Sequence, residues 1–296
     1  MSLHELFAGL GGLGREQLLL LKAWARSLRA REALSTRELV ALTGLSPSKV
    51  KEELGRLHRR RYIARLRGGY VLLSRGLDAL ALKELREAGI ITSLGRALGM
   101  GKEADVYEAL GEKGEALSLK LYRIGRVSFR DVRRKRAYVG PGEAGGWLRI
   151  SIEAAAREFR NAKRAYSLGV RVPRPVARRL HAVVAERVEG DLLWRVRELP
   201  DPALMLRQLL EQIGRAYRGG LVNADLSPFN VLCDRSGGCW IIDWPQALPS
   251  SHPNALALLR RDVRNILLFF RRRFGVELGE AEALSYVLAD GAQAPA

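Results

Sequence analysis

Asp225-Leu-Ser-Pro-Phe-Asn230, followed by Ile242-Asp243, is the stretch that decides how this 296-residue chain is interpreted. Asp225 and Asn230 lie five positions apart in one short loop, and Asp243 follows the apolar strand 239–242. Asp and Asn are common turn residues, so the stretch alone also fits a polar turn between a helix and a strand. The rest of the chain has to distinguish the two interpretations.

The spacing of these three residues is typical of a kinase-type fold, which places a catalytic Asp and two metal ligands around the phosphates of ATP. Phosphoryl transfer requires one carboxylate directed at the incoming nucleophile and hard oxygen ligands for Mg²⁺. We expect Asp225 to be the catalytic carboxylate, and Asn230 and Asp243 to hold the ion.

Composition restricts the class of protein. The chain is 47% hydrophobic, which is enough for a core, and it has no apolar run of about 18 residues that would span a membrane. Its first residues lack the charged-then-apolar order of a signal peptide, and Cys233 and Cys239 form neither a disulfide framework nor a zinc site. We therefore expect a cytoplasmic protein that does not bind membranes.

The net charge of +18 is the second strong feature. Of the 50 basic residues, 41 are Arg and 9 are Lys. Such an excess indicates a polyanionic partner, because every phosphate contact releases condensed counterions. A compositional bias towards Arg, or adaptation to heat, remains open as a second explanation.

The first 76 residues have the pattern of a winged helix. Three helices and two strands are expected, at 15–33, at 36–42 after Ser35, from Ser46-Pro47, at 62–66 and at 70–73, with a hairpin at Gly68-Gly69. In the third helix the apolar residues Val50, Leu54 and Leu57 would face the core. The basic residues on the outer face would contact nucleic acid: Lys49, Lys51, Arg56 and Arg59. A winged helix that contacts protein is the alternative, and RNA fits as well as DNA.

The remaining pattern predicts an α+β fold, a winged-helix domain followed by a truncated two-lobed kinase-like domain. A linker helix is expected within 77–93, an N-lobe over 94–188 with a flexible loop at 125–149, and a C-lobe over 189–296. The expected strands of the N-lobe are at 90–94, 105–109, 116–121, 176–179 and 182–187. The expected helices are at 152–168, capped by Ser151, at 202–218 and at 255–274.

Several weaker signals match the parts of an ATP site. Gly101, Lys102 and Glu103 lie between two strands, where glycines allow backbone N–H groups to approach phosphates, although the third glycine of the kinase loop is replaced by Ala104. Lys120 alternates with apolar residues and is expected to hold the α- and β-phosphates. Glu158 could pair with Lys120, or could be a surface residue paired with Arg157 or Lys163. The backbone of Glu186 and Val188 would contact the adenine.

The order of these motifs resembles that of the RIO family of atypical serine/threonine protein kinases, in the subfamily with an N-terminal winged helix. The resemblance covers nearly all of residues 1–275. It rests on Gly101-Lys-Glu-Ala-Asp-Val-Tyr107, on Leu119-Lys-Leu-Tyr-Arg-Ile-Gly-Arg-Val-Ser-Phe129, on Ile242-Asp-Trp-Pro-Gln246, and on 251–254 and 261–263.

The resemblance implies a role for each matching residue. Lys120, Asp225 and Asp243 would form the catalytic set, Asn230 and Asp243 would bind Mg²⁺ or Mn²⁺, and Glu103 would lie over the phosphates of ATP. Ser128 falls in the family's flexible loop, where autophosphorylation is expected. The family acts in maturation of the small ribosomal subunit near immature rRNA, so the pre-ribosome is the expected partner, and the protein substrate is left open.

The sequence departs from the family pattern at two positions. Asn223-Ala224 replaces the usual His-Gly before the catalytic Asp, and Trp244 replaces the Phe after the metal-binding Asp. We expect altered packing without loss of a catalytic group. Only 53 residues follow Asp243 and no Ala-Pro-Glu motif occurs, so the C-lobe is expected to lack an activation segment. ATP turnover or autophosphorylation would then be the working activity, and by resemblance alone Asp243 could become phosphorylated.

Three functions remain open from the sequence. The first is an Mg-ATP-dependent kinase or ATPase that controls its own association with pre-ribosomal RNA. The second is a nucleic-acid-binding regulator with a non-catalytic kinase scaffold, which the intact set Lys120, Asp225, Asn230 and Asp243 disfavours. The third is a small-molecule phosphotransferase, which would need neither a winged helix nor the basic loop at 123–136.

Overall fold

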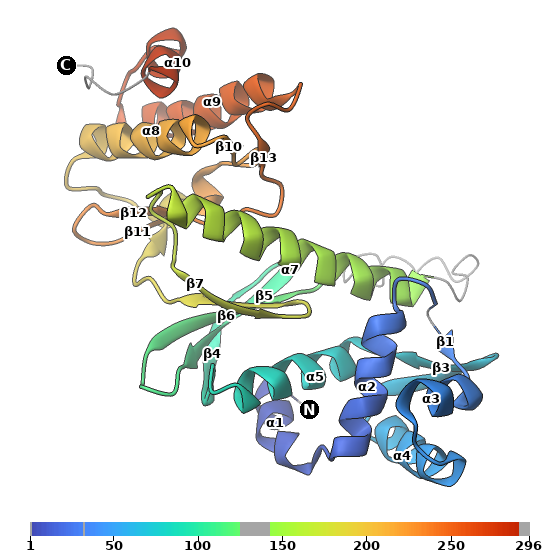
Figure 1. Ribbon diagram of the computed structural model, residues 1–296. Helices are drawn as coiled ribbons and strands as arrows, with labels where there is room; N and C mark the ends of the chain where they lie inside the picture. Colours follow the sequence, from blue (N-terminus) through green and yellow to red (C-terminus); the bar gives the residue numbers. More distant parts are fainter. Residues whose placement is uncertain (1, 32, 125–142, 290–296) are drawn as a thin grey trace, which may run out of the picture. The chain divides into compact units, whose positions relative to one another are not determined.

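The computed structural model describes residues 2–31, 33–124 and 143–289, with side chains from 146 onward in the last range (Figure 1). The chain divides into two compact units. Unit 1 contains residues 1–156 and 176–184, and unit 2 contains residues 157–175 and 185–296. Helices and sheets occur in both, as the predicted α+β class requires. No helix among the described residues is long and apolar enough to cross a membrane.

The first half of unit 1 is the predicted winged helix. It begins with two elements that the sequence analysis missed, α1 (Leu3–Ala8) and the 3₁₀ helix η1 (Gly9–Gly12). The other elements are α2 (Arg15–Ser27), β1 (Ala33–Leu34), α3 (Thr36–Thr43), α4 (Pro47–Arg59), β2 (Ile63–Leu66) and β3 (Gly69–Leu72). The three strands pair in the order β1-β3-β2.

Local capping explains why the winged helix was predictable. Ser35 and Glu38 form a capping box at the start of α3, and Gly44 ends it in the left-handed conformation. Ser46 caps α4 with Pro47 in the first turn, and the three predicted apolar residues of this helix are buried. Gly69 also permits close packing, since a Cβ there would lie 2.4 Å from the Leu34 carbonyl.

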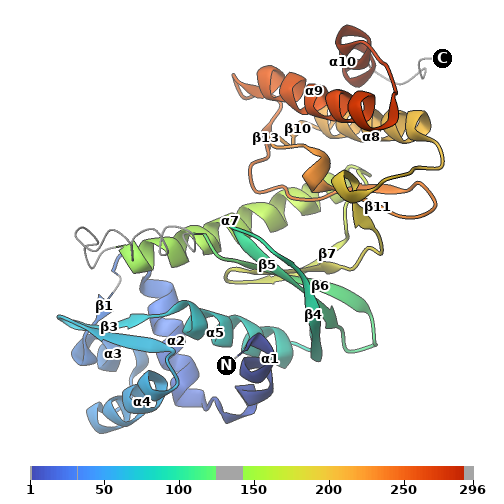
Figure 2. The same ribbon diagram turned by 180° about the vertical axis from the view of Figure 1, so that it is seen from behind.

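The second half of unit 1 is built on a five-stranded sheet next to α5 (Ser74–Glu87) (Figures 1 and 2). Its strands pair in the order β4-β5-β6-β8-β7, and they are β4 (Ser93–Met100), β5 (Ala104–Leu110), β6 (Ala116–Tyr122), β7 (Pro175–Arg179) and β8 (Ala182–Glu186). One hydrophobic core joins the winged helix to this sheet, because buried residues of α2, α4 and α5 cluster with Leu119 and Val184. The winged helix and the sheet are therefore packed as one body.

The predicted start of the long helix was wrong. α7 (Glu143–Ser167) begins inside the loop predicted for 125–149, and Ser151 lies within the helix, where no cap is needed. The Ser151 hydroxyl instead accepts a hydrogen bond from Ile124 N at 3.1 Å. A tertiary contact uses the side chain that looked like a local cap, and the helix continues through Gly145 and Gly146.

Unit 2 is mostly helical, with short sheets between its helices. Its further elements are β9 (Asp191–Leu192), η2 (Leu193–Arg195), α8 (Pro202–Arg218), β10 (Leu221–Val222), η3 (Pro228–Asn230), β11 (Val231–Cys233), β12 (Cys239–Ile241), β13 (Leu248–Pro249), α9 (Ala255–Phe274) and α10 (Glu280–Leu288). The predicted bounds of α8 and α9 are confirmed, and α10 was missed. A second hydrophobic core, with Phe270 and Trp244 fully buried, holds α8 and α9 against β11 and β12.

Candidate active site

The loop after β10 carries the predicted catalytic residue in an accessible position. Asp225 is exposed, and Asn230 ends the 3₁₀ helix η3 that follows it. The side-chain amide of Asn230 donates to the Asp225 carbonyl at 2.8 Å. This bond commits the amide nitrogen of Asn230, so its oxygen is the atom left to bind a cation.

The β11–β12 hairpin brings Asn230 and Asp243 to the same end. Asn230 directly precedes β11 and Asp243 follows Ile242 after β12, and the strands pair from Val231 opposite Ile241. Ile242 N donates to the Asn230 carbonyl at 2.9 Å, which continues the pairing to the open end of the hairpin. Two residues that are far apart in the sequence are thus neighbours in unit 2.

Asn223 connects the catalytic loop to Asp243. Its side-chain oxygen accepts from Asp225 N at 3.1 Å, and its side-chain nitrogen donates to the Asp243 carbonyl at 3.0 Å. Asn223 is buried. The residue that replaces the family's His therefore makes its own polar link between the two functional segments.

Both functional segments contain a residue with left-handed backbone. Ala224 has φ of 64° and Asp243 has φ of 67°, which is an unfavourable region for residues with a Cβ. Such a conformation persists when surrounding bonds over-determine it. The bonds of Asn223 to Asp225 N and to the Asp243 carbonyl are part of that restraint.

Asp262 of α9 supplies the rest of the restraint. Its carboxylate accepts from Ala224 N at 2.8 Å and from Leu226 N at 3.2 Å. Arg261 donates to the Ala224 carbonyl and also contacts Asp262. Burial raises the pKa of Asp262 to about 6, although Arg261 and the two backbone donors act in the opposite direction. The catalytic loop is thus anchored through its main chain on a buried carboxyl group.

The charge state of Asp225 depends on its neighbours. Partial burial raises the pKa of Asp225 above its ordinary value, the Arg261 charge lowers it, and the Asp243 charge raises it further. The electrostatic coupling of Asp225 with Asp243 reflects their proximity. Two carboxylates that repel each other form an environment that favours a divalent cation or the proton of a substrate hydroxyl.

The donor set fits Mg²⁺. Asp243 offers a carboxylate and Asn230 an amide oxygen, and the described residues contain no group of three or more His, Cys, Asp or Glu that could hold a metal. Mg²⁺ in nucleotide sites is held by one or two protein oxygens together with waters and phosphates, so a two-residue set is sufficient. A dedicated zinc or calcium cage does not match these residues.

Glu158 lies beside the segment that contains Asp243. Its carboxylate accepts from Trp244 N at 2.5 Å, and the Glu158 side chain is 8% exposed. Asn161, one turn further along α7, donates to the carbonyls of Trp244 at 2.9 Å and Ala247 at 3.3 Å. The described bond of Glu158 thus fixes the backbone after Asp243, a role that the sequence did not suggest.

The predicted phosphate-binding residues lie in unit 1, on β6 and in the turn before β5. Gly101, Lys102 and Glu103 are exposed, and Gly101 N donates to the Ala104 carbonyl at 2.8 Å across this turn. Lys120 lies opposite Val106 in the β5–β6 pair, with its Nζ 4.9 Å from the centre of the Tyr122 ring. The turn and Lys120 are therefore close along the same pair of strands.

The predicted adenine-contacting residues line a pocket of about 410 Å³ within unit 2. Glu186 N donates to the Arg174 carbonyl at 2.9 Å, and its carboxylate pairs with the Arg174 side chain at 3.3 Å. Val188, Asp234 and Trp240 line the same pocket. Because the amide of Glu186 is already bonded, its carbonyl is the group that could accept from a ligand.

Comparison with known proteins now decides the family. A model described as "RIO domain" matches residues 105–283, and a model described as "Rio2, N-terminal" matches residues 10–88. The chain belongs to the RIO family. Relatives in that family are RIO-type serine/threonine protein kinases, so the predicted fold class and the enzyme class are confirmed.

Individual RIO relatives cover most of the chain. The RIO-type serine/threonine-protein kinase Rio2 of Methanocaldococcus jannaschii is 33% identical over 83% of this chain and 92% of its own length. The serine/threonine-protein kinase rio2 of Schizosaccharomyces pombe is 35% identical over 70% of this chain, and the match spans only 60% of that protein. The crystal structure of the Rio2 kinase–ADP/Mg²⁺–phosphoaspartate complex from Chaetomium thermophilum has a TM-score of 0.82 at 33% identity, covering 97% of this chain and 90% of that one.

The nucleic-acid residues predicted on α4 of this RIO protein divide into two pairs. Lys49 and Arg56 form ion pairs with Glu52 and Glu53 at 2.6–3.2 Å. Lys51 and Arg59 are exposed on the same helix, and within the described residues neither forms an ion pair. Exposed Arg65 and Arg67 lie nearby on the β2–β3 hairpin. The unpaired cations are better placed to meet a phosphate than the two neutralised ones.

Some functional residues of this RIO domain escaped sequence reasoning. Asp262 was expected only as part of a family motif. The residues that it bonds in the loop of Asp225 lie 36 and 38 positions away in the sequence. A signal existed, since Asp262 is a carboxylate on the apolar face of α9 beside Leu259 and Val263. Ser128, predicted to be autophosphorylated, lies outside the described residues.

Proposed function

We propose that this protein is a Mg-ATP-dependent serine/threonine kinase and ATPase in which Asp225 is the catalytic carboxylate. The observation that carries the proposal is the meeting of Asn230 and Asp243 at the open end of one hairpin, bonded to the loop of Asp225. Asn223 and Asp262 hold these segments through hydrogen bonds to their main chain. The arrangement gathers the Asp225 and Asp243 segments and the Asn230 amide oxygen in one part of unit 2.

Each residue has a defined part in the proposed reaction. Asp225 accepts the proton of the attacking hydroxyl or water, and its raised pKa suits a general base. Asn230 and Asp243 would hold Mg²⁺, which neutralises charge on the β- and γ-phosphates when it is bound. Lys120, with the turn formed by Gly101, Lys102 and Glu103, would bind the phosphates, and backbone groups of Glu186 and Val188 would bind the adenine.

The replacement Asp225→Asn tests the catalytic assignment. It keeps the shape of the side chain and removes the base, so Mg-dependent ATP hydrolysis should fall by about 100-fold or more while ATP still binds. Glu280→Gln, at an exposed carboxylate paired with Arg264, is the matched control. An Asp225→Asn protein that hydrolyses ATP at the wild-type rate would show that the base lies elsewhere.

Asp243 is also a candidate acceptor of the phosphoryl group. The related Chaetomium thermophilum structure contains a phosphoaspartate together with ADP and Mg²⁺. In this chain an Asp243 oxygen would form a bond to the γ-phosphorus while the bond to the β-phosphate oxygen breaks and ADP leaves. Hydroxylamine-labile label from γ-labelled ATP on Asp243 would support this step, and stable label confined to Ser128 would contradict it.

The proposed macromolecular partner is precursor RNA of the small ribosomal subunit. The support is the net charge of +18 and the unpaired cations on α4 and the β2–β3 hairpin. ATP turnover would then control release, so the Asp225→Asn protein should remain on ribosomal precursors from which the wild type dissociates. ATP hydrolysis that is stimulated by sugars or aminoglycosides, and not by small-subunit particles, would instead favour a small-molecule phosphotransferase.

A further inference from the structure

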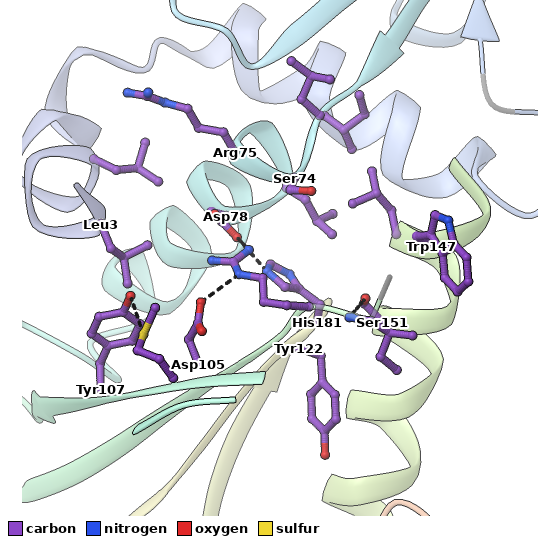
Figure 3. A pocket seen from close by; sticks show the side chains of 18 of the residues that line it. Leu3, Ser74, Arg75, Asp78, Asp105, Tyr107, Tyr122, Trp147, Ser151 and His181 are labelled. Atoms are coloured by element: carbon purple, nitrogen blue, oxygen red, sulfur yellow. Dashed lines mark hydrogen bonds and ion pairs between the residues drawn. The ribbon is translucent and has the colours of Figure 1, made fainter. Parts of the chain in front are cut away.

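A cluster of four charged or titratable side chains lies in unit 1, and three of the four are buried. Asp78 comes from α5, Asp105 from β5, Arg123 from the end of β6 and His181 from the β7–β8 turn. The exposed fractions of Asp78, Asp105 and His181 are 6%, 2% and 1%. Figure 3 shows Asp78 and His181 directed toward each other on one side of a cavity, with Asp105 on strand β5.

Arg123 is the centre of this cluster. Its guanidinium donates to Asp78 at 2.5 Å and to Asp105 at 3.3 Å, and its backbone N–H donates to the Glu103 carbonyl at 2.5 Å. One residue is thus bonded to α5, to β5 and to the turn of residues 101–103. Bonds from a cation to carboxylates are about twice as strong as neutral ones, so Arg123 fixes these three elements relative to one another.

His181 completes the partners of Asp78. Its Nε2 lies 2.8 Å from the same Asp78 oxygen that Arg123 contacts. Burial lowers the pKa of His181 more than Asp78 raises it, so the imidazole is neutral and donates through Nε2. Burial by itself raises the pKa of Asp78, but Arg123 and His181 outweigh that effect and keep it ionised. Asp78 therefore binds Arg123 as a carboxylate.

The cluster borders a cavity, so close packing alone does not hold its side chains in place. A cavity of about 550 Å³ is lined by Asp78, Asp105, Arg123, Ser151 and His181, with apolar residues of α1 and α7 on its other walls. Removing one member would leave a buried charge without its partner, and the neighbouring side chains could shift into the cavity. The bonds themselves, more than the surrounding atoms, keep Arg123 in place.

We propose that Arg123 is a positioning residue for ATP, which holds the turn of residues 101–103 in its phosphate-binding form, and that Asp78 of α5 holds Arg123. Asp78 lies within the segment that matches the Rio2 N-terminal model, residues 10–88. Helix α5, which follows the winged helix, thereby contributes a residue that supports nucleotide binding. This inference rests on the proposed assignment of the turn to the phosphates of ATP.

Isosteric variants test this role by comparing two ligands. Asp78→Asn and Arg123→Lys should each weaken Mg-ATP binding by about tenfold, because one charged hydrogen bond is lost or displaced. Adenosine has no phosphates, so its affinity should be unchanged in both variants. Glu87→Gln, which removes an exposed ion pair with Lys83 on the same helix, is the matched control and should change neither affinity.

Hydrogen–deuterium exchange gives a second readout that needs no ligand. The amide of Gly101, bonded to the Ala104 carbonyl, should exchange faster in Asp78→Asn while amides in α8 keep their wild-type rates. The positioning role would be overturned if the variants lost ATP affinity and adenosine affinity equally. It would also be overturned if neither affinity changed and the Gly101 amide exchanged at the wild-type rate. If the wild-type protein bound Mg-ATP no more tightly than adenosine, the proposed ATP site itself would be wrong.

Discussion

The side-chain nitrogen of Asn223 donates to the Asp243 carbonyl at 3.0 Å, and this bond ties the loop of Asp225 to the segment of Asp243, the proposed metal ligand. The same side chain accepts from Asp225 N at 3.1 Å. Asn223 stands where the family usually has His. One buried amide side chain therefore connects the segments of Asp225 and Asp243.

Replacement of Asn223 by Ala should reduce ATP turnover by about 10- to 100-fold, because both segments lose the bond that sets their spacing. Turnover number and Mg²⁺ dependence should be measured together, since a displaced Asp243 also weakens the ion site. Glu280→Gln is the control, because it removes an ion pair with Arg264 on α9 and touches neither segment. Equal effects of the two replacements would contradict a specific role for Asn223.

Asp262 should make stability depend on pH in a defined window. Burial raises its folded-state pKa to about 6, above its ordinary value of 3.8, so the folded chain retains a proton that the unfolded chain has lost. The corresponding stabilisation is complete below about pH 4 and is lost as the pH rises through 6, with a change of at most about 3 kcal/mol.

Asp262→Asn removes this titration and keeps one acceptor oxygen. The free energy of unfolding, measured by urea denaturation between pH 4 and pH 7, should fall more steeply with rising pH for the wild type than for the variant. Parallel curves would show that the carboxyl group does not titrate in this window. The variant should also be less active. The amide has one oxygen in place of two, and its nitrogen is not an acceptor, so Ala224 N or Leu226 N loses its partner.

Trp244→Phe should destabilise unit 2 by about 1–3 kcal/mol, because a smaller ring leaves a cavity and the Ile241 carbonyl loses its partner. Trp244 is 1% exposed, and its ring nitrogen donates to that carbonyl at 3.1 Å. The backbone bond from Trp244 N to Glu158 is retained, so turnover at low temperature should change much less than the melting temperature. A large loss of turnover with unchanged stability would show that Trp244 acts in catalysis and does not mainly stabilise unit 2.

The winged helix should bind RNA through its unpaired cations. The plot of log affinity against log salt has a negative slope. The double replacement of Lys51 and Arg59 by Gln should make that slope less negative by about 1.4 to 1.8, which corresponds to two lost phosphate contacts. The same replacement of Lys49 and Arg56 should have a smaller effect, because Glu52 and Glu53 already neutralise them. Fluorescence anisotropy with a labelled RNA at several salt concentrations measures both slopes.

Elements that are specified by neighbouring residues were predictable from the sequence. The caps Ser35 and Ser46 set the starts of two helices, and Asp201, whose side chain accepts from Leu204 N, sets the start of α8. Asp225, Asn230 and Asp243 were found because their order along the chain is itself the signal. The backbone bond from Ile242 N to the Asn230 carbonyl, next to Asp243, is consistent with that order.

Features that depend on distant contacts were not predictable. Ser151 was taken for a helix cap, but it bonds to Ile124 from within α7. Asp78 and His181 are 103 residues apart, and no local pattern connects them. The division of the α4 cations into paired and unpaired residues depends on side-chain geometry along the helix, and the periodicity alone placed all four on one face.

The β11–β12 hairpin has a consequence for engineering. The distance between Asn230 and Asp243 is set by cross-strand pairs next to them, and the number of residues at the tip does not enter. The tip at 235–237 contains the exposed residues Arg235 and Ser236, whereas Gly237, with φ of 88°, would be strained by an added Cβ. A fluorescent label or a short peptide tag inserted between Arg235 and Ser236 should therefore leave the spacing of Asn230 and Asp243 unchanged.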